Sequence, residues 1–171
     1  MVKTFFISLL LLNMNVATAE TRDAHQYFFD AKLGDFKSEL AVAKKAGKKG
    51  IVLMYELDDC PFCFRMKQTV LNQSEVQDYY HQHFLIFPVD IKGDIAMVDF
   101  KGKHTTEKAF GLEQRIYGTP VFDFFDLDGN QLVRFPGAAK DANEFLLLGR
   151  YVVEGAYQTM PFAKYKRQVV Q

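Results

Sequence analysis

The sequence predicts a single α/β domain with a mixed four-stranded sheet that is covered by helices on both faces. Two apolar strands separated by helices indicate a βαβ crossover, which pairs them in parallel. A hairpin signal and a closing amphipathic helix follow, and the hairpin adds two antiparallel strands. With the strands counted along the chain, we expect the sheet order 2-1-3-4.

The composition is that of a folded protein with one hydrophobic core. The 171 residues are 49% hydrophobic and 15% aromatic, which excludes a disordered chain. The 21 basic and 21 acidic side chains give zero net charge without a long basic run, so nucleic acid is not expected as the main partner. The two cysteines exclude a disulfide-dense scaffold, yet they lie only three positions apart.

Residues 1–19 are expected to be an export signal outside the fold. Lys3 precedes an apolar stretch, Phe5 to Leu12, and Ala17-Thr18-Ala19 is a small-x-small cleavage pattern. The apolar stretch is shorter than the roughly 20 residues of a membrane-spanning helix, which disfavours the alternative of an uncleaved anchor. We therefore expect a single mature domain, residues 20–171, exported to a bacterial periplasm.

The first elements of this domain are a helix, a buried strand and a second helix. Residues 23–47 look helical throughout, with Gly47 at the end. Residues 51–55 are a continuous apolar run, as expected of a strand buried on both faces. A helix is expected from Pro61 to about Leu71.

The middle of the chain predicts a helix, a strand and an insertion. Apolar residues from Val76 to His83 repeat with helical spacing. Residues 84–89 are typical of a strand, and Pro88 favours an edge or a bulge because it cannot donate a ladder hydrogen bond. Residues 92–105 are polar and punctuated by glycines, which indicates an insertion between elements.

The last third predicts a helix, a hairpin and a closing helix. Ala109 to Ile116 has helical spacing and ends near Gly118. Strands at 121–125 and 131–135 flank Asp128-Gly129-Asn130, a strong hairpin signal. A long amphipathic helix runs from Ala142 to Val153, and a short terminal helix is expected after Gln158.

The cysteines belong to the motif Cys60-Pro61-Phe62-Cys63, which lies between a buried strand and a helix. This position puts the first sulfur at a helix N-terminus, where free N–H groups and the helix dipole stabilise a thiolate. Cys60 is therefore the candidate exposed nucleophile and Cys63 the shielded resolving thiol. Phe62 lies between them and is a candidate apolar contact for a partner.

Other interpretations of the two cysteines stay open at this point. They could form a purely structural disulfide, although a four-residue ring gives the smallest gain in chain entropy. A metal site would need further ligands such as His81 and His83, whose spacing is unusual for a zinc finger, so no metal is expected. A buried inert pair is disfavoured by the charged residues that flank the motif.

The strand, the C-x-x-C motif, its helix and Gly118-Thr119-Pro120 before a hairpin together resemble the thioredoxin superfamily over residues 35–157. More narrowly, Leu53-Met54-Tyr55-Glu56, Arg134-Phe135-Pro136-Gly137 and residues 151–157 are similar to exported proteins of the SoxW type, which are associated with bacterial sulfur oxidation. The resemblance implies a thioredoxin fold with Cys60 and Cys63 as the redox pair. It also implies that Pro120 is cis and that Thr119 offers its backbone to an extended partner chain.

The sequence departs from thioredoxins at one chemically important position. Thioredoxins carry a buried Asp six residues before the first cysteine, whereas this chain has Met54 there. The usual proton acceptor for Cys63 is therefore absent, and Glu56 or water is the candidate substitute. No residues for glutathione binding can be assigned, and no cofactor is expected.

These observations predict a periplasmic thiol–disulfide oxidoreductase that reduces protein or small-molecule disulfides. The resemblance implies re-reduction by a membrane electron donor, and a monomer is expected because no dimerisation domain is present. The alternatives are a disulfide oxidase or isomerase of exported proteins, and a non-catalytic binding module of the same fold. No residue in the sequence fixes the reduction potential, and hence the direction of the chemistry.

Overall fold

The computed structural model describes residues 20–169, so the predicted export signal lies outside the described residues. The helices are α1 (Ala24–Tyr27), α2 (Phe36–Lys45), α3 (Pro61–Thr69), α4 (Ser74–His83), α5 (Glu107–Glu113), α6 (Ala142–Val153), the short 3-10 helix η1 (Ala156–Gln158) and α7 (Phe162–Val169). The strands are β1 (Gly50–Glu56), β2 (Phe84–Asp90), β3 (Ala96–Val98), β4 (His104–Thr106), β5 (Val121–Phe125) and β6 (Gln131–Pro136). Within residues 20–169, none of the helices has both the length and the apolar character needed to cross a membrane.

The main sheet has four strands in the order β2-β1-β5-β6. β1 pairs in parallel with β2 and antiparallel with β5, and β5 pairs antiparallel with β6. Counted along the chain, this is the predicted order 2-1-3-4, so the α/β fold with a mixed four-stranded sheet is confirmed. β2 is an edge strand, as Pro88 indicates, and the missing N–H of Pro88 therefore interrupts no inner ladder.

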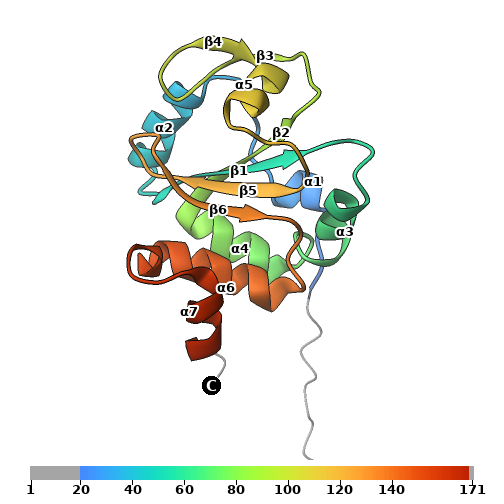
Figure 1. Cartoon of the computed structure of the whole chain (residues 1–171), viewed down its shortest axis with the longest axis vertical. Helices are drawn as coiled ribbons and strands as arrows, with labels where there is room; N and C mark the ends of the chain where they lie inside the picture. Colours follow the sequence, from blue (N-terminus) through green and yellow to red (C-terminus); the bar gives the residue numbers. More distant parts are fainter. Residues whose placement is uncertain (1–19, 170–171) are drawn as a thin grey trace, which may run out of the picture.

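The sheet separates two hydrophobic clusters, because alternate residues of its inner strands point to opposite faces. On one face, α1, α3, α4 and α6 cover a cluster that includes both cysteines. On the other face, α2, α5 and the small β3–β4 sheet cover the second cluster (Figure 1). The redox pair thus belongs to one layer of the molecule.

The prediction of one helix over residues 23–47 is wrong. The chain forms the short helix α1, leaves the helical conformation, and begins α2 at Phe36. Gly34 has φ +80°, in the left-handed region that favours glycine. Asp35 then caps α2, since its carboxylate accepts a hydrogen bond from the N–H of Ser38 at 2.9 Å. Gly34 and Asp35 therefore separate α1 from α2, although the apolar residues on either side have helical spacing.

Residues 92–105 are more ordered than the predicted polar insertion. They contain β3 and the start of β4, which pair antiparallel as a separate two-stranded sheet. The carboxylate of Asp99 holds the turn between these strands by accepting hydrogen bonds from the N–H groups of Lys101 and Lys103, each at 2.8 Å. Met97 is 2% exposed and docks the small sheet on the second cluster.

The remaining elements differ from prediction mainly at their ends. α3 stops at Thr69, two residues before the predicted end. α5 begins at Glu107 because Thr106 caps it by accepting a hydrogen bond from the N–H of Ala109 at 3.2 Å. The expected terminal helix is present as α7, and η1 precedes it.

Candidate active site

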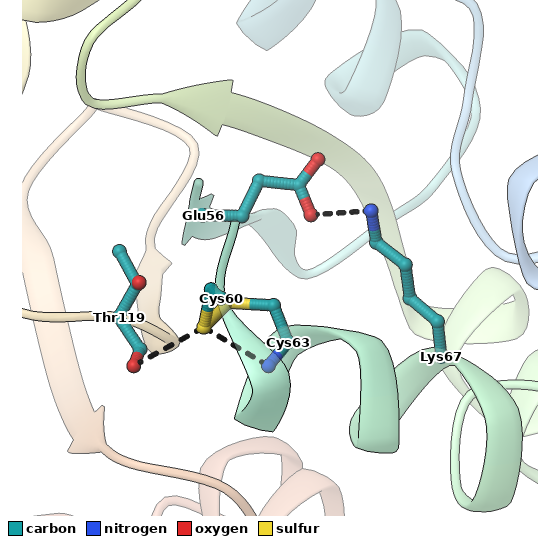
Figure 2. Close-up of a disulfide and its surroundings, with 5 residues drawn as sticks. All are labelled: Glu56, Cys60, Cys63, Lys67 and Thr119. Carbon is teal, nitrogen blue, oxygen red and sulfur yellow. Dashed lines mark hydrogen bonds and ion pairs between the residues drawn. A yellow bond between two sulfur atoms is a disulfide. The ribbon is translucent and has the colours of Figure 1, made fainter. Parts of the chain in front are cut away.

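Cys60 and Cys63 form a disulfide at the point where the chain leaves β1 and begins α3. Cys60 is the N-cap of α3 and Pro61 is its first residue, where the N–H that proline lacks would have no helical partner. The Cα atoms of the two cysteines are 5.2 Å apart, across the first helical turn. The structure thus brings together the two residues that the sequence indicates as the redox pair (Figure 2).

Both cysteines are buried in the disulfide form, so the expected exposure of Cys60 is not seen, although Cys60 is the more accessible of the two. Cys60 is 8% exposed and Cys63 only 2% exposed. The backbone N–H of Cys63 donates to the Sγ atom of Cys60 at 3.1 Å. In a reduced pair, this N–H and the positive end of the α3 dipole would stabilise a thiolate on Cys60. The geometry therefore favours Cys60 as the attacking sulfur.

The loop before β5 approaches the disulfide from the side opposite α3. The carbonyl oxygen of Thr119 lies 3.5 Å from the Sγ atom of Cys60 (Figure 2). The peptide bond between Thr119 and Pro120 is cis, and Pro120 is buried. The Pro120 carbonyl accepts a hydrogen bond from the N–H of Gly137 at 2.8 Å, which ties the loop to the end of β6. The Thr119 carbonyl thus lies beside Cys60, and the contact of Thr119 and Pro120 with a partner chain stays a prediction.

Phe62 projects from the first turn of α3 between the cysteines. Its side chain is 60% exposed, so it contributes little to the core. Phe64 on the next turn is 65% exposed. An exposed aromatic residue beside a reactive sulfur is available to an apolar partner surface.

A partly buried ion pair lies beside the disulfide (Figure 2). Glu56, the last residue of β1, contacts the Nζ atom of Lys67 at 2.7 Å through its carboxylate, and the two side chains are only 16% and 14% exposed. Lys67 follows Cys63 by four positions on α3, which puts both side chains on one face of that helix. The Nζ atom of Lys67 also lies 5.9 Å above the ring of Phe29.

This ion pair lies near Cys63, the thiol that needs a proton acceptor (Figure 2). Met54, at the position where thioredoxins carry an Asp, is fully buried in the apolar cluster. The sequence analysis names Glu56 as a candidate substitute acceptor, but it does not predict that Glu56 pairs with Lys67. The i, i+4 spacing of Cys63 and Lys67 was the available signal.

Two other charged residues near the motif, Arg65 and Asp59, have contacts elsewhere. Arg65 donates to the carbonyl oxygens of Ala139 at 3.0 Å and Lys140 at 3.5 Å, which fastens α3 to the segment before α6. Asp59 is exposed and lies 3.8 Å from the Nζ atom of Lys92. The Glu56–Lys67 pair is much less exposed than the Asp59–Lys92 pair.

The histidines considered as metal ligands have other contacts. Nε2 of His81 lies 3.0 Å from the carbonyl oxygen of Tyr27. His83 stacks edge-on against Tyr79, with ring centroids 4.7 Å apart. Across residues 20–169, no three His, Cys, Asp or Glu side chains gather in the manner of a metal site.

Comparisons with solved structures agree with this architecture. A thioredoxin-fold protein from Helicobacter pylori is 21% identical with a TM-score of 0.58, and the match covers 72% of this chain and 87% of that chain. A thioredoxin from Thermus thermophilus is 24% identical with a TM-score of 0.54, covering 70% of this chain and 84% of that chain. The DsbH oxidoreductase is 18% identical with a TM-score of 0.53, covering 91% of this chain and 96% of that chain. No curated protein matches the sequence significantly.

The likeness to these structures establishes the fold, and a match to a family model establishes the family. Residues 36–153 match the thioredoxin-like domain family, a span that runs from the start of α2 to the end of α6. The match includes the C-x-x-C disulfide, the Glu56–Lys67 pair and the Thr119–Pro120 loop. With this span and this redox pair, the chain belongs to the thioredoxin-like domain family.

Proposed function

We propose that residues 20–171 form a periplasmic thiol–disulfide oxidoreductase that reduces disulfides in a sulfur-oxidation type of pathway. The observation that carries the proposal is the Cys60–Cys63 pair at the start of α3, with the Thr119 carbonyl 3.5 Å from the Cys60 sulfur. The sequence resemblance to exported SoxW-type proteins supports the direction and the pathway. The export signal expected in residues 1–19 supports the compartment.

The proposed reaction is a two-step thiol–disulfide exchange. In the reduced protein, the Cys60 thiolate attacks one sulfur of the client disulfide, and the other client sulfur leaves as a thiolate. The Cys63 thiol then gives up its proton and attacks the Cys60 sulfur. The Cys60–Cys63 disulfide forms, the second client sulfur leaves, and two electrons have passed to the client. Protons from solvent complete the client thiols.

Phe62, Thr119 and Pro120 are the proposed client contacts in this reaction. Phe62 offers exposed aromatic surface next to Cys60. Thr119 and Pro120 line the opposite side of the same sulfur, where a client chain would pass in an extended conformation. The client is a protein disulfide or a small-molecule disulfide.

The oxidised protein must be re-reduced for a second turnover. We propose a membrane electron donor whose own dithiol is oxidised as Cys60–Cys63 is reduced. The two sulfurs carry both electrons, so the reaction needs no cofactor or metal. The protein is proposed to act as a monomer.

The decisive measurement is the reduction potential of the mature protein, read by alkylation and mass after equilibration in graded dithiothreitol buffers. We expect a reversible two-electron couple near or below the value of about −270 mV that is typical of thioredoxin. A Cys63→Ser variant is the control, because it has no internal disulfide to form.

Two other outcomes would overturn the proposal in different ways. A potential close to about −120 mV would make the protein an oxidant or an isomerase, because its disulfide would then tend to oxidise clients. The absence of any reversible couple would leave a non-catalytic binding module of the same fold.

A further inference from the structure

A pocket of about 410 Å³ includes Thr119, the residue that flanks the redox pair, in its lining. One wall is the segment 115–121, and the other is formed by Arg134, Pro136 and Gly137. The pocket contains Thr119, whose carbonyl oxygen is 3.5 Å from the Cys60 sulfur. The pocket and the Cys60 sulfur therefore share Thr119 as a neighbour.

The floor and walls of the pocket are mostly apolar. Ile116 and Val121 are 4% and 8% exposed, and Pro120 is also buried. Pro136 is exposed at the far wall. These side chains suit the aliphatic part of a client side chain.

The pocket is lined by two arginines, Arg115 and Arg134, and only Arg115 is not paired with a carboxylate among the described residues. Arg134 is neutralised, since its Nε and Nη2 atoms donate to the buried carboxylate of Asp123 at 2.8 and 2.6 Å. Its Nη1 atom donates to the carbonyl oxygen of Gln114 at 3.0 Å. Arg115 is exposed and, among the described residues, forms no ion pair or side-chain hydrogen bond. The pocket therefore carries one uncompensated positive charge.

The backbone fixes Arg115 at the rim of the pocket. Arg115 has φ 57°, in the left-handed region, two residues after the end of α5. The N–H groups of Arg115 and Ile116 donate to the carbonyl oxygens of Leu112 and Gly111, each at 2.9 Å. Arg134 also donates to the carbonyl oxygen of Gln114, the residue before Arg115. These hydrogen bonds fix the backbone from which the Arg115 side chain extends.

A client chain has a route into this pocket. Within residues 20–169, the N–H of Thr119 has no hydrogen-bond acceptor. An extended client segment can accept from this N–H with its own carbonyl. In an extended chain, side chains two positions apart point to the same face, roughly 7 Å apart. A residue two positions from the client cysteine can therefore extend past Thr119 toward the pocket.

We propose that this pocket binds an acidic side chain of the client, a glutamate two positions from the cysteine that bonds to Cys60. Its carboxylate pairs with Arg115, and its aliphatic stem contacts Ile116 and Pro136. This inference rests on the proposed function and names the substrate class that the site selects, a disulfide in an acidic sequence.

The test compares short peptide disulfides that differ only in Glu, Gln or Lys at the positions two residues before and after the cysteine. For the reduced wild-type protein, we expect kcat/KM to be about fivefold higher for Glu than for Gln at one of these positions, and lowest for Lys. The preference should shrink as salt increases, because the arginine is exposed.

Variants of Arg115 separate charge from backbone effects. Arg115→Asn removes the charge but tolerates the left-handed conformation, so it should fold and lose the preference for Glu. Arg115→Lys should keep most of the preference. Lys101→Gln, which removes an exposed charge on the β3–β4 turn, should leave the preference as in wild type.

A second measurement keeps this inference independent of turnover. NMR titration of the oxidised protein with the same peptides, carrying Ser in place of Cys, should give tighter binding for Glu and shifts at the Arg115 and Gly118 amides. Equal binding of Glu, Gln and Lys peptides would overturn the acidic pocket. Binding selectivity without reduction of any peptide would overturn the proposed function alone.

Discussion

Glu56 is the residue whose role in the chemistry is most open to direct test. It follows the strand that carries Met54 and pairs with Lys67, one helical turn beyond Cys63. A carboxylate enclosed at this place can accept the proton that Cys63 must lose before it attacks the mixed disulfide. The ion pair with Lys67 then keeps that carboxylate oriented toward α3.

We expect Glu56→Gln to slow the release of the mixed disulfide by about tenfold or more and to flatten its pH dependence, because an amide cannot accept the proton. Stopped-flow single turnovers across a pH series measure this step. Glu75→Gln, at an exposed position in the first turn of α4, is the matched control. A wild-type rate and pH profile in Glu56→Gln would remove Glu56 from the mechanism.

At the scale of elements, one charged pair locks β5 to β6. Asp123 is fully buried on β5, and Arg134 on β6 donates two hydrogen bonds to its carboxylate. Burial raises the pKa of Asp123, and the hydrogen bonds and charge of Arg134 oppose that rise. Because Arg134 also holds Gln114, the same pair positions the loop that leads to Thr119.

We expect Arg134→Met to lower the free energy of unfolding by about 3 kcal/mol at neutral pH, since it leaves a buried carboxylate without its partner. The loss should be smaller near pH 4. The folded-state pKa of Asp123 then lies well above the unfolded value of about 3.9, so stability falls as pH rises through that window. Urea unfolding at several pH values measures the effect.

Asp123→Leu combined with Arg134→Met should recover most of the lost stability, because no charge is then buried. A loss from Arg134→Met that is the same at every pH would contradict this account, since it would show that the uncompensated carboxylate is not its cause.

Comparison of the elements with the sequence shows where local patterns suffice. The four core strands agree with prediction to within a residue, because buried strands leave continuous apolar runs such as Ile51 to Tyr55. The redox pair is equally visible, since its chemistry depends on residues close together in the chain. The break between α1 and α2 was missed because Gly34 and Asp35 interrupt two segments that both have helical spacing.

Features that depend on packing could not be predicted in this way. β3 and β4 are three residues each, and only β3 is apolar, so the pattern is too short to indicate a strand pair. The Glu56–Lys67 pair joins a strand end to a helix, and the pocket at Arg115 joins two loops with β6. Each arises only when the sheet order is known and the helices are in place.

For the whole molecule, the redox state of the cysteines and the stability of the fold are thermodynamically linked. A four-residue ring restricts the unfolded chain by only about 2 kcal/mol. Any further difference in unfolding free energy between the disulfide and dithiol forms reflects how the folded protein favours one form. A reductant favours its own disulfide, so its oxidised form is the more stable one.

We therefore expect the oxidised protein to unfold at higher urea concentration than the reduced protein, with about 1.4 kcal/mol for every 30 mV by which folding lowers the potential. Urea titrations with and without dithiothreitol measure the difference, and Cys63→Ser should show no response to dithiothreitol. A more stable reduced form would mean that the protein is an oxidant.

The exposure of Phe62 has a practical consequence. The chain contains no tryptophan, and Phe62 lies exposed between the two cysteines. A tryptophan introduced there would be the single indole of the molecule, set against a disulfide that quenches its emission and a dithiol that quenches it far less. Reduction and re-oxidation of the Cys60–Cys63 bond could then be followed in real time by the change in tryptophan fluorescence, without an added label.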